Sequence, residues 1–197
     1  MTKSLARIKV EIIGTTPLLM DRFPDKAKEE ILMKDFGMSR TKKDRLRNKE
    51  AEMEEAIHYT KDKKYCFPAT AFEKGMMTVA PYAGNKKFTI KLVGCAISIK
   101  GNLIDQDGAP CVPITSKKGF KEFKHWVRHN VKFSPLFEDW KTELIIEYPP
   151  DMITADDIVT CLDLAGSMVG IGGWRPRCTD GGKGIYGQYK VLSCDNA

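Results

Sequence analysis

Seven glycines lie within eighteen positions near the carboxyl end, from Gly170 to Gly187. Glycine tolerates positive φ angles and the close approach of another backbone, so such a segment can present its amides without side-chain obstruction. Trp174, Arg175 and Arg177 lie among these glycines. Guanidinium groups and backbone amides suit phosphate, and an indole ring suits stacking on a nucleic-acid base. The structural alternative is that Trp174 packs beneath the loop and Arg175 pairs with an acid.

Known nucleotide-binding motifs do not account for this loop. Lys183 is followed by Gly184, where a P-loop would place Ser or Thr, and no strand leads directly into the glycines. A dinucleotide-binding fingerprint places its glycines before a helix, whereas these glycines follow a helical pattern. The loop therefore matches neither motif.

A second candidate stretch, residues 115–141, is basic and aromatic. It holds seven Lys and Arg against three Asp and Glu. Its interleaved rings are Phe120, Phe123, Trp126, Phe133, Phe137 and Trp140. Basic side chains release counterions when they bind phosphates, and rings stack on unpaired bases, at ~1–3 kcal/mol per base. The alternative is that the rings belong to the core beneath a solvated lysine face.

Residues able to catalyse a reaction are sparse. His125 and His129 are four residues apart, which would place both on one face of a helix, but no third metal ligand accompanies them. His58 ends a charged helical pattern and is expected at the surface. The six cysteines are scattered without a Cys-x-x-Cys pair, so we expect reduced thiols and neither a zinc nor a redox motif. We therefore expect no metal, no cofactor and no catalysis.

The composition is that of an ordinary globular protein. The 197 residues are 42% hydrophobic and 29% charged, which disfavours disordered and fibrous classes. The formal charge of +6 permits a polyanionic partner. No window approaches the ~18 apolar residues of a membrane span, and the first residues lack a signal-peptide core. A cytoplasmic protein is expected.

The elements that must position these residues follow from hydrophobic periodicity. Residues 7–13 alternate charged and apolar side chains, which predicts a strand with one buried face. Residues 154–169 place apolar side chains three or four apart behind a Thr-Ala-Asp-Asp start, which predicts a capped amphipathic helix. The spacing of Thr70 and Glu73 predicts a capping box and a helix over 70–80. Further strands are expected at 65–70, 87–99, 109–114, 141–147 and 185–192. The strand at 109–114 is expected to form a hairpin with the strand at 87–99.

The stretch 34–64 is densely charged, with more basic than acidic residues between Lys34 and Lys64. Residues 44–57 fit a solvated helix with opposite charges a turn apart. The alternative is a basic insertion in which residues 37–47 contact phosphates.

The order of these motifs resembles the repeat-associated mysterious protein (RAMP) superfamily, which includes CRISPR backbone and repeat-processing subunits. The resemblance rests on the early strand, the late amphipathic helix and the loop Gly-Ile-Gly-Gly-Trp-Arg-Pro-Arg at 170–177 before a terminal strand. The segments Pro-Leu-Leu-Met-Asp-Arg-Phe at 17–23 and Ala-Gly-Ser-Met-Val-Gly at 165–170 are also similar to small RAMP-like proteins of bacteriophages and prophages. The match covers residues 8–24 and 142–192.

The resemblance implies a ferredoxin-like, RRM-related α+β fold with a βαββαβ core, and RNA binding by copies stacked along the strand. It implies that the glycine loop shapes a nucleic-acid groove, that basic segments continue this groove, and that 115–141 forms a protruding thumb. The candidate nucleic-acid-binding residues are Arg22, Lys117, Lys118, Lys124, Arg128, Gly172, Gly173, Trp174, Arg175, Arg177 and Lys183. Some relatives cleave RNA without a metal, so the enzymatic alternative uses His125 or His129 as general acid or base.

We therefore expect one α+β domain over residues 1–197, with insertions at 34–64 and 115–141, in the cytoplasm of a bacterial or phage-infected cell. Its expected function is non-catalytic binding of single-stranded nucleic acid, RNA preferred, as a homo-oligomer or a ribonucleoprotein subunit. Two further alternatives are a phage protein that coats or anneals single-stranded DNA, and a structural subunit whose basic patches contact an acidic protein.

Overall fold

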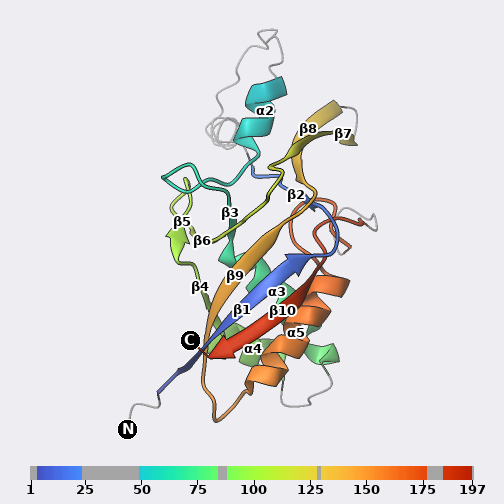
Figure 1. Ribbon diagram of the computed structural model, residues 1–197. Coiled ribbons are helices and arrows are strands. Elements are labelled where there is room, and N and C mark those ends of the chain that lie inside the picture. Colours follow the sequence, from blue (N-terminus) through green and yellow to red (C-terminus); the bar gives the residue numbers. More distant parts are fainter. Residues whose placement is uncertain (1–3, 24–48, 84–87, 128–129, 177–183, 197) are drawn as a thin grey trace, which may run out of the picture.

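The computed structural model has an α+β architecture built on antiparallel sheets (Figure 1). It describes residues 4–23, 49–83, 88–127, 130–176 and 184–196. The main sheet has four strands in the order β10-β1-β9-β4. These strands are β1 (Ala6–Gly14), β4 (Ser98–Lys100), β9 (Lys141–Tyr148) and β10 (Tyr189–Asn196).

Strand β1 is central because its sequence alternates as predicted. Ile8, Val10 and Ile12 are buried on one face, where each apolar side chain removed from water stabilises the fold. Val10 lies opposite Leu144 of β9 on one side and Cys194 of β10 on the other, and both pairings are antiparallel. The strand predicted at 7–13 is therefore confirmed.

Two helices, α3 (Ala69–Val79) and α5 (Ala155–Met168), cover the buried face of the sheet. Helix α5 begins as predicted, because the Thr154 hydroxyl accepts from the Asp157 amide and the Asp157 carboxylate accepts from the Thr154 amide. Gly75 of α3 lies against Ala165 of α5, which lets the two helices approach closely. Smaller elements are α2 (Lys49–Glu55), the 3-10 helix η1 (Ala80–Tyr82) and α4 (Ile90–Ala96).

The other face of the main sheet is charged, and three of its cations pair with carboxylates. Arg7 and Lys100 both reach Glu147, at 2.5 and 2.9 Å, and Lys9 lies 2.8 Å from Glu143. The two cations hold the pKa of the Glu147 carboxyl below its usual range. This paired surface is called the open sheet face below.

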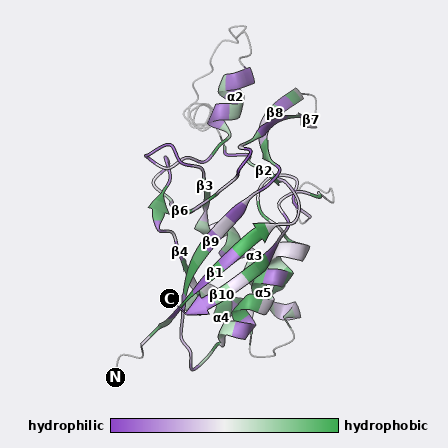
Figure 2. Ribbon diagram, viewed as in Figure 1, coloured by the Kyte–Doolittle hydropathy of each residue, from purple (hydrophilic) through white to green (hydrophobic). Residues whose placement is uncertain are grey.

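Two small three-stranded sheets complete the structure. One joins β3 (Cys66–Pro68), β6 (Pro110–Pro113) and β5 (Leu103–Ile104). The other joins β2 (Leu18–Leu19), β8 (Asn130–Phe137) and β7 (Lys121–Val127). Strands β7 and β8 form a hairpin that projects with α2 beyond one end of the main sheet (Figure 1). Figure 2 shows that α2 is largely hydrophilic, as expected of a helix with no buried residue.

The strand predicted at 87–99 is wrong for most of its length. The Thr89 hydroxyl accepts from the Leu92 amide and so starts helix α4, which ends before the short strand β4. Val93 is buried where α4 packs beside α3, so tertiary packing overrides the β-branched character of the segment. The predicted hairpin partner at 109–114 pairs with β3 and β5 instead.

The capping box predicted for Thr70 and Glu73 is also wrong. Helix α3 begins one residue earlier, with Pro68 at the N-cap and no side-chain cap. The Glu73 carboxylate instead accepts a hydrogen bond from the Ile99 amide at 2.9 Å. The start of α3 is therefore left without a side-chain cap, which matters for the pocket described below.

The last strand starts at Tyr189, four residues later than predicted. Gly187 has a φ of 70° and donates its amide to the Pro17 carbonyl at 2.7 Å, so the chain before Tyr189 belongs to the loop. Within the described part of the chain, no helix is both long and apolar enough to cross a membrane. The whole basic segment 37–47 and part of the insertion predicted at 34–64 lie outside the described residues.

Candidate nucleic-acid interface

The hairpin β7–β8 lies within the basic-aromatic stretch 115–141 and presents two different faces. Side chains alternate along β7, so Phe123 and His125 share one face while Lys124 and Trp126 share the other. The register places Phe133 of β8 opposite Lys124, on that second face. We call the two surfaces the inner and the outer hairpin face.

The outer hairpin face offers a cation beside an exposed ring. Trp126 is 66% exposed, and Lys124 is exposed and forms no ion pair with a described residue. On the same face, the Lys49 amine lies 5.4 Å from the Phe133 ring centre and pairs with Glu122, so these three groups interact with one another. The groups left open on this face are therefore Lys124 and Trp126.

The inner hairpin face packs against the glycine loop. Phe123 and His125 stack with ring centres 5.5 Å apart. Edge contacts at 5.6 and 5.3 Å then join His125 to Trp174 and Phe123 to Tyr186. The two stretches that the sequence marks for nucleic-acid binding are thus in contact with each other. Trp174 remains 45% exposed, so it does not pack wholly beneath the loop.

His125 is not presented to a substrate. It is only 4% exposed, and burial lowers its pKa below the ordinary value. Its Nε2 lies 3.0 Å from Ser134 Oγ, so the ring is held inside the hairpin. A surface acid–base role for His125, as the endoribonuclease alternative requires, has no support here, and His129 lies outside the described residues.

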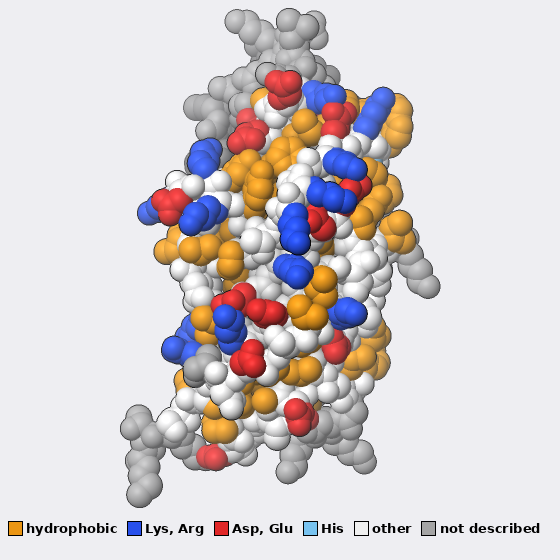
Figure 3. Space-filling view, viewed as in Figure 1, with side chains coloured by type: hydrophobic (Ala, Val, Ile, Leu, Met, Phe, Trp, Pro, Cys, Tyr) orange, Lys and Arg blue, Asp and Glu red, His pale blue; other side chains and the backbone are white. Residues whose placement is uncertain are grey.

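Lys117 and Lys118 lie in the turn that leads into the hairpin, and both are exposed without an ion pair to any described residue. Asp139 fixes this turn by accepting from the Ser116 hydroxyl at 2.9 Å and the Lys117 amide at 3.1 Å. These hydrogen bonds lower the pKa of Asp139. Figure 3 shows Lys and Arg side chains gathered around the base of the hairpin, with acidic side chains among them.

Two other lysines of this region are neutralised. Lys121 lies 2.8 Å from Glu138, and Lys132 pairs with Asp21. The cations available to a phosphate are therefore fewer than the basic content of 115–141 suggests. Among the described residues of the hairpin and of the turn that leads into it, Lys117, Lys118 and Lys124 form no ion pair, and we call them the hairpin lysines.

The glycines of the loop serve close packing, which corrects the expectation of an unobstructed groove. Gly172 has a φ of 80°, and a Cβ there would lie 2.5 Å from the Leu19 carbonyl oxygen. Gly173 donates its amide to that same oxygen at 2.8 Å. Gly172 and Gly173 therefore hold the loop against β2, and their backbones are not open to a ligand on that side.

Arg175 remains available despite this packing. Its Nη1 donates to the Gly172 carbonyl at 2.9 Å, and it forms no ion pair with any carboxylate in the described ranges. The predicted alternative, an Arg175–acid pair, is not found among the described residues. Trp174, the preceding residue, has a φ of 51°, a left-handed conformation that is costly for a bulky side chain.

Arg22 is the clearest correction among the predicted binding residues. It is 4% exposed, and its Nε and Nη2 donate to the two oxygens of Asp107 at 2.8 and 2.5 Å. Such a bidentate pair anchors the segment after β2 to the turn after β5. Arg22 is a structural residue. Arg128, Arg177 and Lys183 lie outside the described residues.

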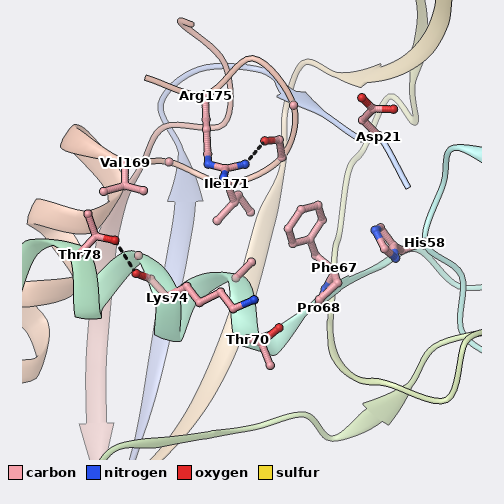
Figure 4. Close-up of a pocket in the computed structure, with 15 residues that line it drawn as sticks. Asp21, His58, Phe67, Pro68, Thr70, Lys74, Thr78, Val169, Ile171 and Arg175 are labelled. Carbon is pink, nitrogen blue, oxygen red and sulfur yellow. Dashed lines mark hydrogen bonds between the residues drawn. The ribbon is translucent and has the colours of Figure 1, made fainter. Parts of the chain in front are cut away.

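A pocket of about 550 Å³ lies between α3, β3 and the glycine loop. Arg175 and Lys74 both line it, and so does His58 (Figure 4). Sequence reasoning missed Lys74, although Thr70, Lys74 and Thr78 are spaced by four and form one polar stripe on a helix. His58 is half-buried instead of lying at the surface, and burial lowers its pKa.

No group of three or more His, Cys, Asp or Glu that could hold a metal ion occurs among the described residues. The cysteines in the described ranges are free thiols. No protein-family model matches the chain, and no curated protein matches it significantly.

Proposed function

We propose that this protein binds single-stranded nucleic acid without catalysing a reaction, and that the outer hairpin face and its basic turn are the main contact surface. The observation that carries the proposal is the juxtaposition of unpaired Lys124 with the exposed ring of Trp126 on one face of β7. Lys117 and Lys118 extend the positive charge toward the base of the hairpin.

This combination suits an unpaired strand for two reasons. A base stacked on an exposed aromatic ring contributes about 1–3 kcal/mol, and any base can stack. Each phosphate met by an unpaired lysine releases condensed counterions, which favours binding at low salt. A duplex would satisfy only the second interaction, because its bases are already stacked.

The open sheet face is a poor alternative surface. Its cations Arg7, Lys9 and Lys100 already pair with carboxylates, so a phosphate would have to compete with those partners. Lys141 and Lys190 on this face form no ion pair with a described residue, but none of the exposed aromatic side chains in the described ranges lies on the strands of the main sheet. Binding through stacking on the sheet, as RRM domains do, is therefore not the mode we propose.

We further propose a ferredoxin-like core and a RAMP-like relationship. Read in chain order, β1, α3, β4, β9, α5 and β10 give a βαββαβ sequence of elements. The strand order β10-β1-β9-β4 with antiparallel neighbours, and the two helices on one face, support this assignment. The preference for RNA and the assembly of copies side by side along a strand rest on the RAMP resemblance.

The test is fluorescence anisotropy with a labelled single-stranded RNA, and with DNA of the same sequence, over a series of salt concentrations. The double variant Lys124→Ala/Trp126→Ala should weaken RNA binding by more than tenfold, since it removes one phosphate contact and one stacking platform. A matched control is Lys100→Ala/Leu192→Ala, which removes one lysine and one exposed apolar side chain from the main sheet.

The proposal fails if the double variant and the control bind alike, or if the wild type shows no salt-dependent binding. In the second case a partner of another class, such as an acidic protein, has to be sought. Tighter binding of DNA than of RNA would replace the RNA preference with the DNA-coating alternative.

A further inference from the structure

The pocket between α3 and the glycine loop is separate from the hairpin surface, since no described residue of β7 or β8 lines it. Two cationic side chains enter it from different walls. Figure 4 shows Arg175 extending from the loop and Lys74 lying along α3, so the two side chains belong to different walls of the pocket. Two positive charges that line one concave site favour an anionic ligand.

The side chains of Lys74 and Arg175 both have hydrogen-bond donors that can bind a ligand. Lys74 is exposed and forms no ion pair with a described residue. Arg175 uses Nη1 for the Gly172 carbonyl, and its remaining N–H groups have no partner in the described part of the chain. The Gly172 bond fixes the guanidinium in place, so little side-chain freedom is lost when a ligand binds.

The start of helix α3 adds further positive potential to the pocket. Pro68 at the N-cap makes no side-chain hydrogen bond, and the first turn holds no acidic residue. Amides at the start of a helix carry partial positive charge and suit a phosphate. The exposed hydroxyl of Thr70 lies on the same stripe as Lys74.

The pocket is larger than a phosphate ion needs. Phe67, Pro68 and Ile171 supply an apolar wall, while His58 and Asp21 lie toward the other side of the pocket (Figure 4). A volume of about 550 Å³ falls in the range of sites for organic ligands. A ligand with a phosphate at one end and a flat, partly apolar body at the other matches both regions.

We propose that this pocket holds a single nucleotide, with its phosphate between Lys74 and Arg175 and its nucleoside against the wall of Phe67 and Ile171. The inference deepens the proposed function and rests on it where the nucleotide is one unit of the bound strand. A free nucleotide has the same chemistry, and the experiment below distinguishes the two sources.

The experiment is isothermal titration calorimetry of the full chain with adenosine 5′-monophosphate, adenosine and inorganic phosphate. The monophosphate should bind at least about tenfold more tightly than adenosine, because a charge-assisted hydrogen bond contributes more than a neutral one. Lys74→Ala should weaken monophosphate binding by about tenfold and leave adenosine unaffected. The Lys74 side chain forms no hydrogen bond or ion pair with a described residue, and the Thr78 hydroxyl bonds only its backbone carbonyl, so this variant should fold normally.

Lys100→Ala is the matched control, since it removes a lysine from the open sheet face and should leave monophosphate binding unchanged. Arg175→Lys keeps the charge but loses the planar fork, and it should weaken monophosphate binding less than Lys74→Ala combined with Arg175→Lys. Equal binding of adenosine and its monophosphate, or wild-type binding by Lys74→Ala, would overturn the pocket assignment.

Competition separates the two sources of nucleotide. An oligonucleotide that displaces the monophosphate shows that a unit of the strand occupies the pocket, whereas simultaneous binding shows that a free nucleotide does. If the monophosphate fails to bind while hairpin-dependent RNA binding persists, only the pocket proposal falls. If the monophosphate binds while oligonucleotides show no salt-dependent binding, the proposed function falls and the pocket stands.

Discussion

Two surfaces of this molecule carry lysine and arginine, and they use these residues differently. On the open sheet face, Arg7, Lys9 and Lys100 each lie within 2.9 Å of a glutamate oxygen. On the hairpin and its turn, Lys117, Lys118 and Lys124 form no ion pair within the described residues, and the exposed ring of Trp126 lies on the same face as Lys124.

The difference shows that net charge alone does not locate a binding surface. A lysine that already neutralises a carboxylate gains little from a phosphate, because the gain is offset by the lost pair. An unpaired lysine beside an exposed ring has no such competitor. The formal charge of +6 is therefore informative only after local pairing is known.

The largest expected effect comes from removing the hairpin lysines together. Lys117→Ala/Lys118→Ala/Lys124→Ala should weaken single-stranded RNA binding by roughly 100-fold at about 0.1 M salt and flatten the salt slope by about 2, on the basis of ~0.7 counterions per phosphate contact. Anisotropy over a salt series measures both quantities.

The matched triple variant is Arg7→Ala/Lys9→Ala/Lys100→Ala, which removes the same charge from the open sheet face. It should keep an affinity within about threefold of the wild type, since each of its cations is already paired. If both triple variants lose affinity equally, the contrast between the two surfaces is wrong and only net charge matters.

The next effect concerns stability and tests whether the loop glycines are architectural. Gly172→Ala should lower the free energy of unfolding by about 2 kcal/mol, because the new Cβ combines a positive φ with a clash against β2. Gly108→Ala is the matched control. Its φ of 83° is similar, but nothing lies within 4 Å of its Cβ, so about 1 kcal/mol is expected. Urea denaturation compares them, and equal losses would contradict the packing role.

A smaller effect is expected from the hairpin ring. Trp126→Ala should weaken RNA binding by about tenfold through lost stacking, whereas Trp126→Phe should retain most of the affinity. Anisotropy at fixed salt measures the change, and the salt slope should stay constant because no charge is removed. Leu192→Ala, which also truncates an exposed apolar side chain but lies on β10, should have no effect. A change of slope in Trp126→Ala would contradict the stacking role.

The smallest effect is a pH dependence that differs between the two regions. Burial lowers the pKa of His125 from its ordinary 6.5, so the unfolded chain binds more protons than the folded one at mildly acidic pH. Stability should therefore fall as the pH drops below about 6.5, and His125→Gln should reduce that fall. His58 contributes in the same direction, because its pKa is also lowered.

On the open sheet face, the corresponding loss of stability occurs at a lower pH. The folded pKa of Glu147 lies below its ordinary 4.5, so its contribution is present above that value and disappears as the pH falls through the folded pKa. Glu147→Gln should leave the loss between pH 7 and 5 unchanged. Denaturation curves at a series of pH values test both expectations, and a flat wild-type profile would contradict the histidine effect.

The elements with a complete local signal could be predicted from the sequence. Residues 7–13 alternate strictly, and the start of α5 carries both partners of its cap at Thr154 and Asp157. The sequence predicts a strand in place of helix α4, because the start of this helix depends on one hydroxyl, Thr89, and on burial of Val93 against α3. That burial is a long-range contact and has no signature in the segment itself.

The candidate site was predictable in part. The basic and aromatic composition of 115–141 indicated the hairpin surface, but only the register shows which lysines are unpaired. Arg22 looked available because its partner, Asp107, is eighty-five residues away in the sequence. Lys74 was overlooked because its pocket is formed by α3 and a loop about a hundred residues later, which no local pattern reveals.

The edge contact between His125 and Trp174 has a consequence for how a strand is gripped. Because the His125 ring packs against the Trp174 ring at 5.6 Å, the described part of the hairpin is held against the loop before a ligand binds. A flexible hairpin would lose conformational entropy on binding, and this loss would weaken its affinity. A hairpin that is already held in place avoids that cost. A nucleic-acid strand that approaches this protein meets a hairpin that is already in place. We therefore expect association to be fast and free of a slow conformational step.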